Sequence, residues 1–119
     1  MCGGIGVESF HRSHDAQASF DRKVRCRSLS EEYVRKRKDS GILEVLQKND
    51  YSSARNSCIA ELTDETVATG LNIWSFDVAD VATGETLFHE QCDQIIGDCS
   101  DQARTARDKA FGEVLRSSQ

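Results

Sequence analysis

The tetrapeptide VATG occurs twice in this chain, at residues 67–70 and 81–84, and the stretch LNIWSFDVAD lies between the two copies. Apolar side chains recur at every second position of that stretch, at Trp74, Phe76 and Val78, which is the pattern of a half-buried strand. Each Thr-Gly supplies a glycine that tolerates the positive φ of a hairpin turn, commonly a type I turn closed by a bulge. The repeat therefore predicts both turns of a three-stranded antiparallel meander from Cys58 to Cys92.

The C-terminal stretch carries the clearest helical pattern of the chain. Ser100 fits the cap of a helix, and Asp101 fits its first turn. The apolar residues that follow share one stripe, made of Ala103, Ala106, Ala110, Phe111 and Val114. The cations follow toward the negative end of the helix dipole, at Arg104, Arg107, Lys109 and Arg116. We expect this helix to cover one face of the sheet.

The segment SFDRKVRCRS, residues 19–28, predicts a fourth strand. Phe20, Val24 and Cys26 would lie on one face of an extended chain, with charged residues on the other face. Further along, the segment DYSSARNSCIAEL, residues 50–62, fits a helix and a strand equally well.

Ser28 and Glu31 have the spacing of a capping box, which predicts a helix that begins at Leu29. We expect this helix to pause at residues 39–41, where Ser and Gly interrupt it. A second short helix is then expected over residues 42–49, because the apolar residues before and after the pause would not share one face.

Together these elements predict an α+β fold. An antiparallel β-meander would be covered by the C-terminal helix and by one or two short N-terminal helices. The 119 residues fit a single domain with one modest core. Residues 1–15 lack periodicity and are expected to be loosely ordered.

The chain has five cysteines, an odd number. We set Cys2 apart from the other four, which could form two disulfides in any of three pairings: Cys26, Cys58, Cys92 and Cys99. Cys92 and Cys99 bracket a loop short enough to close by a disulfide. Disulfides indicate an oxidising compartment, whereas a cytosolic protein would keep the thiols reduced, and the sequence supports both interpretations. Mature bacterial lipoproteins begin at an acylated Cys that small residues often follow, and in the start MCGG a Met could stand in place of a removed signal, which makes Cys2 a lipidation candidate.

The charges are separated along the chain. Residues 22–38 hold eight Lys or Arg against two Glu, whereas residues 56–103 hold ten Asp or Glu and no Lys or Arg. We favour mutual neutralisation within the fold; in the alternative, the basic segment meets phosphate, anionic lipid or an acidic partner. The partner-binding candidates are the acidic residues Glu61, Glu65, Asp77, Asp80 and Glu85, expected to face solvent, and the basic residues Arg35, Lys36, Arg37 and Lys38.

Two groups of residues could each form half of a zinc site, but neither has the paired close spacings of a structural site. The groups are His11, His14 and Asp15, and His89, Glu90 and Cys92. We favour chance surface histidines, and we expect no metal and no cofactor. No spacing unites a Cys or Ser nucleophile with a His, so we name no catalytic residue and expect no enzyme.

The stretch LNIWSFDVADVATGETLFHE resembles a hairpin of small bacterial cell-envelope lipoproteins, including the peptidoglycan-synthase activator and curli-secretion lipoprotein groups. In these groups an alternating strand ends in Asp-x-x-Thr-Gly-Glu and returns through an apolar pair. The resemblance covers about 20 of the 119 residues. It implies an extracytoplasmic, non-catalytic α+β domain that works by contacting a partner.

From the sequence we expect a non-catalytic extracytoplasmic binding or structural accessory protein, periplasmic or membrane-anchored as a lipoprotein. The alternative is a small cytosolic acidic protein of the immunity or inhibitor type. We expect a protein partner, no nucleic acid because stacking aromatics are not interleaved with the cations, and membrane contact only through the lipid anchor.

Overall fold

The structure is a computed structural model that describes the backbone of residues 2–39, 43–68 and 71–116. Side chains are described for residues 17–38, 43–67 and 72–116. The elements in chain order are α1 (Cys2–Asp39), β1 (Leu43–Ser52), β2 (Ser57–Ala68), β3 (Leu71–Asp80), β4 (Glu85–Cys92) and α2 (Asp98–Arg116).

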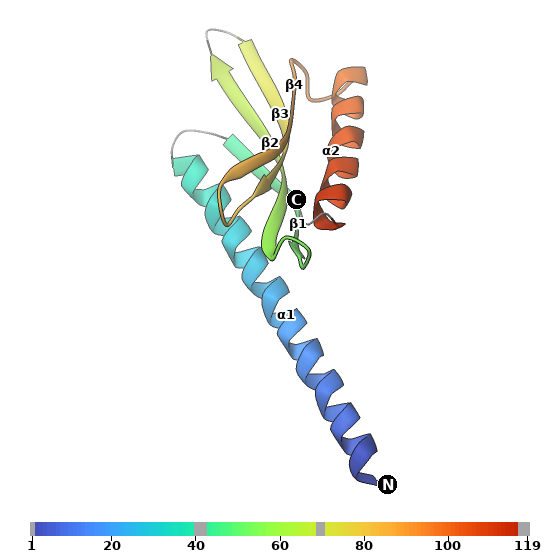
Figure 1. Cartoon of the computed structure of the whole chain (residues 1–119). Coiled ribbons are helices and arrows are strands. Elements are labelled where there is room, and N and C mark those ends of the chain that lie inside the picture. Colours follow the sequence, from blue (N-terminus) through green and yellow to red (C-terminus); the bar gives the residue numbers. More distant parts are fainter. Residues whose placement is uncertain (1, 40–42, 69–70, 117–119) are drawn as a thin grey trace.

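The four strands form one antiparallel sheet in the order β1-β2-β3-β4, so each strand pairs with its neighbour in sequence. Helices α1 and α2 lie on opposite faces of this sheet (Figure 1). The α+β prediction is confirmed, as is the meander from Cys58 to Cys92, which corresponds to β2, β3 and β4.

The face toward α2 holds the larger apolar side chains. Phe76 and Val78 of β3 are fully buried there, as the alternation predicts, and Trp74 packs at the end of the same row. Phe111 of α2 packs on Val78 and on Ile59 of β2. This apolar contact fixes α2 on the sheet, as the sequence predicts.

The face toward α1 holds smaller side chains. Ala60 and Leu62 of β2 are buried there together with Ala79 of β3, beneath Tyr33 and Val34 of α1. The strand interpretation of the ambiguous segment 50–62 is therefore correct from Ser57 onward. Both faces of the sheet are covered, which explains why strand positions that would be solvent-facing in a two-layer fold are buried.

Two predictions for the N-terminal half are wrong. Residues 19–28 belong to α1 and are not a strand, and residues 43–49 belong to β1 and are not a helix. The capping-box residues Ser28 and Glu31 lie inside α1, where Glu31 pairs with Arg27 at 3.1 Å. The pause predicted at residues 39–41 coincides with the end of α1 at Asp39, so one long helix replaces the predicted strand and the first of the two short helices.

The second VATG turn has the expected geometry. Gly84 has a φ of +79° and its N–H donates to the carbonyl of Asp80 at 2.7 Å, closing the turn between β3 and β4. In the first copy, residues 69 and 70 lie outside the described part of the chain. An unpredicted turn joins β1 to β2, and there Asn56 adopts a φ of +52°, which Asn tolerates better than most side chains.

The molecule is elongated, with extents of 72 × 29 × 24 Å, because α1 extends well beyond the sheet (Figure 1). The backbone of residues 2–15, predicted to be loosely ordered, is helical and forms the projecting end of α1. Cys2 is the first residue of the helix, and its side chain lies outside the described set.

Candidate functional site

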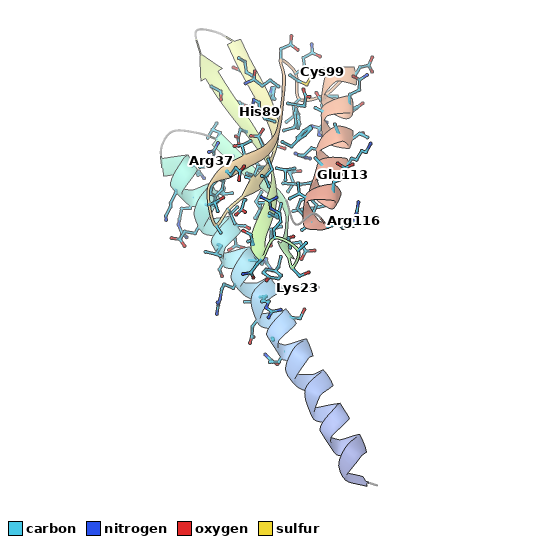
Figure 2. The ribbon with its side chains drawn as sticks, viewed as in Figure 1. Lys23, Arg37, His89, Cys99, Glu113 and Arg116 are labelled. Atoms are coloured by element: carbon cyan, nitrogen blue, oxygen red, sulfur yellow. A yellow bond between two sulfur atoms is a disulfide. The ribbon has the colours of Figure 1, made fainter. Side chains whose placement is uncertain are left out.

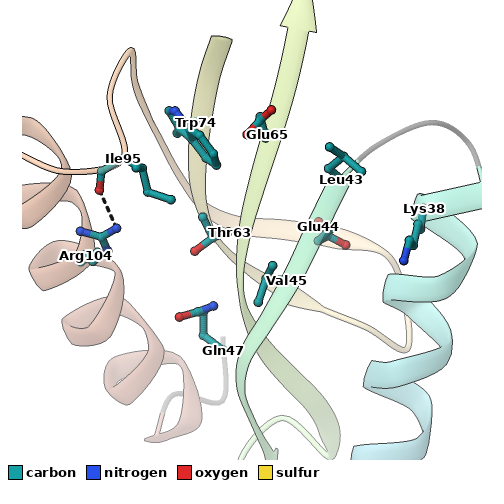
Figure 3. A pocket seen from close by; sticks show the side chains of 10 residues that line it. All are labelled: Lys38, Leu43, Glu44, Val45, Gln47, Thr63, Glu65, Trp74, Ile95 and Arg104. Atoms are coloured by element: carbon teal, nitrogen blue, oxygen red, sulfur yellow. Dashed lines mark hydrogen bonds between the residues drawn. The ribbon is translucent and has the colours of Figure 1, made fainter.

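A groove of about 380 Å³ opens on the α2 face of the sheet, beside the start of α2 (Figure 3). Leu43 and Val45 of β1 line one side, and Trp74 and Ile95 line the other. Thr63 of β2 lies between them. Arg104 of α2 also lines the groove, which therefore lies beside the first turns of that helix.

Large apolar side chains are unusually exposed around this groove. Leu43 is 55% exposed, Val45 is 57% exposed and Ile95 is 36% exposed. Val67, next after Glu65 on the same face of β2, and Ile96, next to Ile95, are also exposed. A contiguous apolar surface of this kind, rimmed by charge, marks a contact site more often than an isolated exposed leucine does.

Charged groups stand at the rim of the groove. Lys38 at the end of α1 is exposed, and Glu65 of β2 is half-buried. Arg104 of α2 donates from Nη2 to the carbonyl of Ile95 at 2.6 Å, which fixes the loop before α2 (Figure 3). Arg104 also lies over the ring of Phe76, 5.2 Å from its centroid, so its position is set from both sides.

On the opposite face, Arg37 of α1 binds two carboxylates of the sheet. Its Nε donates to Glu44 Oε2 at 2.8 Å, and its Nη2 donates to Asp64 Oδ2 at 3.0 Å. Glu44 and Asp64 are directly paired positions on β1 and β2, and both are buried. Arg37 stacks on Tyr33 one turn earlier, 5.4 Å from the ring centroid.

This burial raises the pKa of Glu44 to about 8, and contact with the Asp64 carboxyl adds to the shift while Arg37 opposes it. Glu44 Oε1 and Asp64 Oδ1 are buried and receive no donor among the described residues. The two carboxyls and the guanidinium together form a structural clasp for the end of α1.

Arg107 makes the corresponding contact on the α2 face, and it is buried. Its Nη1 donates to the carbonyl of Leu62 at 3.1 Å and to Thr63 Oγ1 at 2.8 Å. Glu61 Oε2 lies 4.0 Å from Nε, and burial of Glu61, reinforced by Asp108, raises its pKa to about 7. From the sequence, Arg107 was expected only to follow the helix dipole as one of several cations. Its buried hydrogen bonds to β2 were not predicted.

The acidic partner-binding candidates divide into buried and accessible residues. The expectation that Glu61, Asp77 and Asp80 face solvent is wrong, since each is more than 90% buried. Glu61 faces Arg107, and Asp80 accepts from Ser57 Oγ at 2.6 Å and from the N–H groups of the second VATG turn. Glu65 is half-buried at the groove, and Glu85 is exposed.

Asp77 is hydrogen-bonded to His89, with Oδ1 2.6 Å from Nδ1. Burial raises the pKa of Asp77, and His89 acts against that rise. The imidazole of His89 is therefore hydrogen-bonded to the neighbouring strand, and the sulfur of Cys92 is bonded to Cys99. Among the described side chains, no group of three or more His, Cys, Asp or Glu is arranged to hold a metal ion. His11, His14 and Asp15 lie outside the described side chains.

The basic candidates behave differently from one another. Arg37 forms ion pairs with Glu44 and Asp64 in the clasp, which is the predicted neutralisation within the fold. Arg35 and Lys38 are exposed, and Lys36 pairs with Glu32 on the same helix at 3.4 Å. Neutralisation by the sheet is therefore confirmed for Arg37 and does not extend to the exposed face of α1.

Cys26, Cys58, Cys92 and Cys99 form two disulfides. Cys26–Cys58 joins α1 to β2, with the Cα atoms 5.2 Å apart, and both residues are buried. Cys92–Cys99 closes the loop between β4 and α2, with the Cα atoms 6.0 Å apart. Of the three pairings that the sequence left open, this is the one formed.

The comparisons with known proteins give no relative. No protein-family description, no curated protein and no solved structure matches the chain. Neither described helix contains an apolar stretch of the length and composition needed to cross a bilayer.

Proposed function

We propose that this chain is a non-catalytic extracytoplasmic accessory protein that binds a protein partner through the groove at the end of the sheet, with Cys2 as its lipid attachment point. The observation that carries the proposal is the exposed apolar surface of β1 at that groove, formed by Leu43 and Val45. The occupant we propose is an extended segment of the partner.

The edge position of β1 supports this occupant. Within the sheet β1 is hydrogen-bonded to β2 alone, so its other edge can receive an added strand. Leu43 and Val45 lie at alternate positions and point to the same face, where an added strand would place its own alternate side chains. A partner segment with apolar residues at every second position therefore fits both the edge and the groove.

The two disulfides support the compartment. They link buried and partly exposed cysteines at both ends of the sheet, and such bonds persist in oxidising compartments. Thiol counting on protein from its native cells tests this point: at most one free thiol is expected in denaturant without reductant. Four or five free thiols would favour the cytosolic alternative of the immunity or inhibitor type.

Site-specific photo-crosslinking tests the groove. A crosslinker at Val45 should trap one partner in the native cell envelope, and the substitution Leu43→Asp should reduce that yield at least about tenfold by placing a charge in the apolar contact. The control position is Thr86, an exposed residue on the opposite edge strand, β4. Equal yields at Val45 and Thr86, or a yield indifferent to Leu43→Asp, would contradict the proposal.

A further inference from the structure

Helix α1 is strongly basic over the half that packs on the sheet. Between residues 17 and 38 the helix holds eight Lys or Arg against three Asp or Glu. Arg37 forms ion pairs with the sheet, at Glu44 and Asp64. The other seven are exposed: Arg22, Lys23, Arg25, Arg27, Arg35, Lys36 and Lys38.

Neutralisation along the helix itself is weak. Arg27 pairs with Glu31 with its side chain 76% exposed, and Lys36 pairs with Glu32 with its side chain 75% exposed. Such exposed pairs are screened by solvent and leave most of the field in place. Within residues 17–38, 43–67 and 72–116, Arg25 and Arg35 form no ion pair.

One flank of the helix also carries exposed apolar side chains. Cys26, Ser30 and Val34 face the sheet, four residues apart, and a second stripe runs along the flank of the helix beside them. That stripe is Phe20, Val24, Arg27, Glu31, Arg35 and Lys38, in steps of three or four residues. Phe20 is 61% exposed and Val24 is 50% exposed, in the part of α1 that leaves the sheet (Figures 1 and 2).

We propose that α1 lies on an anionic lipid bilayer through this stripe. Basic side chains near an anionic surface each add binding free energy, and an apolar pair such as Phe20 and Val24 can insert at the level of the headgroups. This inference deepens the proposed function and rests on it, since it assumes a protein stationed at a membrane. It adds a second contact to the acyl chain proposed for Cys2.

The charge distribution of the rest of the molecule fits this orientation. Exposed carboxylates gather at the end of β4, in the loop after it and at the start of α2, which covers the opposite face of the sheet from α1 (Figure 1): Glu90, Asp93, Asp98 and Asp101. An anionic surface attracts α1 and repels this acidic end, which sets the orientation of the molecule.

A bilayer fits better than a nucleic acid. Proteins that bind single strands stack bases on exposed aromatic rings between the cations. Here Tyr33 is half-buried beneath Arg37, and Tyr51 lies under Arg22 at 5.6 Å from the ring centroid. Phe20 is then the exposed ring of the described part of α1, beside Val24, which offers a lipid surface more than a base.

Vesicle co-sedimentation of the oxidised, unlipidated full chain tests the inference. The probes are vesicles of phosphatidylcholine alone and of phosphatidylcholine with 30% phosphatidylglycerol, a composition we choose to give a clear anionic surface. Binding to the anionic vesicles should exceed binding to neutral vesicles at least about tenfold at low salt and should weaken as salt rises. Equal or absent binding to both would overturn the inference.

Two matched variants locate the contact. Arg27→Glu/Arg35→Glu should lower anionic-vesicle binding at least about tenfold, while Lys109→Glu/Arg116→Glu on α2, with the same change in net charge, should lower it less than about threefold. Phe20→Ser/Val24→Ser, which leaves the charge unchanged, should also weaken binding and covers the case in which charge reversal disturbs the helix. Equal losses in the α1 and α2 charge variants would overturn the inference, as would tighter binding to duplex or single-stranded DNA than to vesicles.

This result is separable from that of the groove. Leu43→Asp should abolish partner crosslinking and leave vesicle binding unchanged, because Leu43 lies on the opposite face of the sheet from α1. Failure of the vesicle experiment alone leaves the partner groove standing. Failure of the crosslinking experiment alone leaves the lipid contact standing.

Discussion

Helix α2 and helix α1 cover opposite faces of one sheet, and different forces hold them there. Helix α2 packs Phe111 against Ile59 and Val78 in an apolar cluster. Helix α1 presents Cys26, Ser30 and Arg37 to the sheet, and its contact consists of a disulfide, a buried hydroxyl and an ion-pair clasp around a few small apolar residues. One helix is attached by burial of apolar area, and the other by specific bonds.

This difference explains why α2 could be predicted from the sequence and α1 could not. Hydrophobic periodicity reports apolar burial, which is the force that holds α2. A helix fixed by one disulfide and one arginine needs few apolar residues, so its buried face leaves little periodic signal. Such an attachment also makes the position of α1 depend on redox state and pH.

The largest expected effect comes from the disulfides. Cys26→Ser/Cys58→Ser should lower the free energy of unfolding by roughly 4 kcal/mol, because the bond spans 32 residues. Cys92→Ser/Cys99→Ser, with a separation of 7 residues, should lower it by roughly 2 kcal/mol. Urea unfolding followed by Trp74 fluorescence measures both, and equal losses would show that the α1 bond is not the stronger constraint.

The second effect concerns apolar packing. Phe111→Ala should lower the free energy of unfolding by about 3 kcal/mol, since it leaves a cavity over Ile59 and Val78. The matched truncation on the other helix, Val34→Ala, should cost roughly 1 kcal/mol because Val34 is only partly buried over a smaller cluster. Similar costs at both sites, measured by urea unfolding, would remove the distinction between the two interfaces.

A smaller pair of effects separates the two arginines. Arg107→Met should cost about 2 kcal/mol, because it leaves Thr63 and the Leu62 carbonyl without their buried donor. Arg37→Met should cost about 1 kcal/mol, because Arg37 is one-third exposed and solvent screens its pairs. Thermal unfolding at pH 7 ranks the two, and a larger loss for Arg37→Met would contradict the ranking.

The last effect is a change in the free energy of unfolding with pH. The folded-state pKa values of Glu44, about 8, and Glu61, about 7, lie above the ordinary value of 4.5. A carboxyl of this kind loses its proton first in the unfolded chain, so its stabilisation is complete below about pH 4.5 and is lost as pH rises to 7 and 8. Stability should fall over that range, with a slope of at most about 1.4 kcal/mol per pH unit for one proton.

Glu44→Gln and Glu61→Gln should each flatten the part of the curve that belongs to the replaced carboxyl. The exposed Glu85→Gln serves as the control, and it should leave the curve unchanged. The measurement is unfolding by urea at several pH values between 5 and 9. A curve that rises with pH, or one that Glu44→Gln does not alter, would contradict the raised pKa of Glu44.

The sequence predicts the parts of the fold whose local pattern matches their final environment. The alternation of Trp74, Phe76 and Val78 and the glycine of the second VATG place β3 and its turn, because one face of that strand meets an apolar helix. The stripe ending in Phe111 and Val114 places α2 for the same reason. The cysteine count predicts two disulfides but not their pairing, which depends on which elements meet in space.

The strand β1 could not be read from its own residues. The spacing of Leu43 and Leu46 suits a helix, and pairing with β2 decides the outcome. The exposed Leu43 and Val45, which make the proposed groove, carry no sequence signal that distinguishes them from core residues. The buried states of Glu61 and Asp77 were missed because the second helical layer covers a face that a simple meander would leave in water.

Amide hydrogen exchange of α1 tests the central claim most directly, by comparing the oxidised protein with Cys26→Ser/Cys58→Ser. We predict that amides from Cys26 to Arg37 lose protection in the variant, while those of α2 around Phe111 and of β3 keep it. The Cys92→Ser/Cys99→Ser variant should show the reverse, with losses confined to the start of α2. Full protection of α1 without its disulfide would contradict the account, because it would mean that the disulfide is not needed to hold this helix on the sheet.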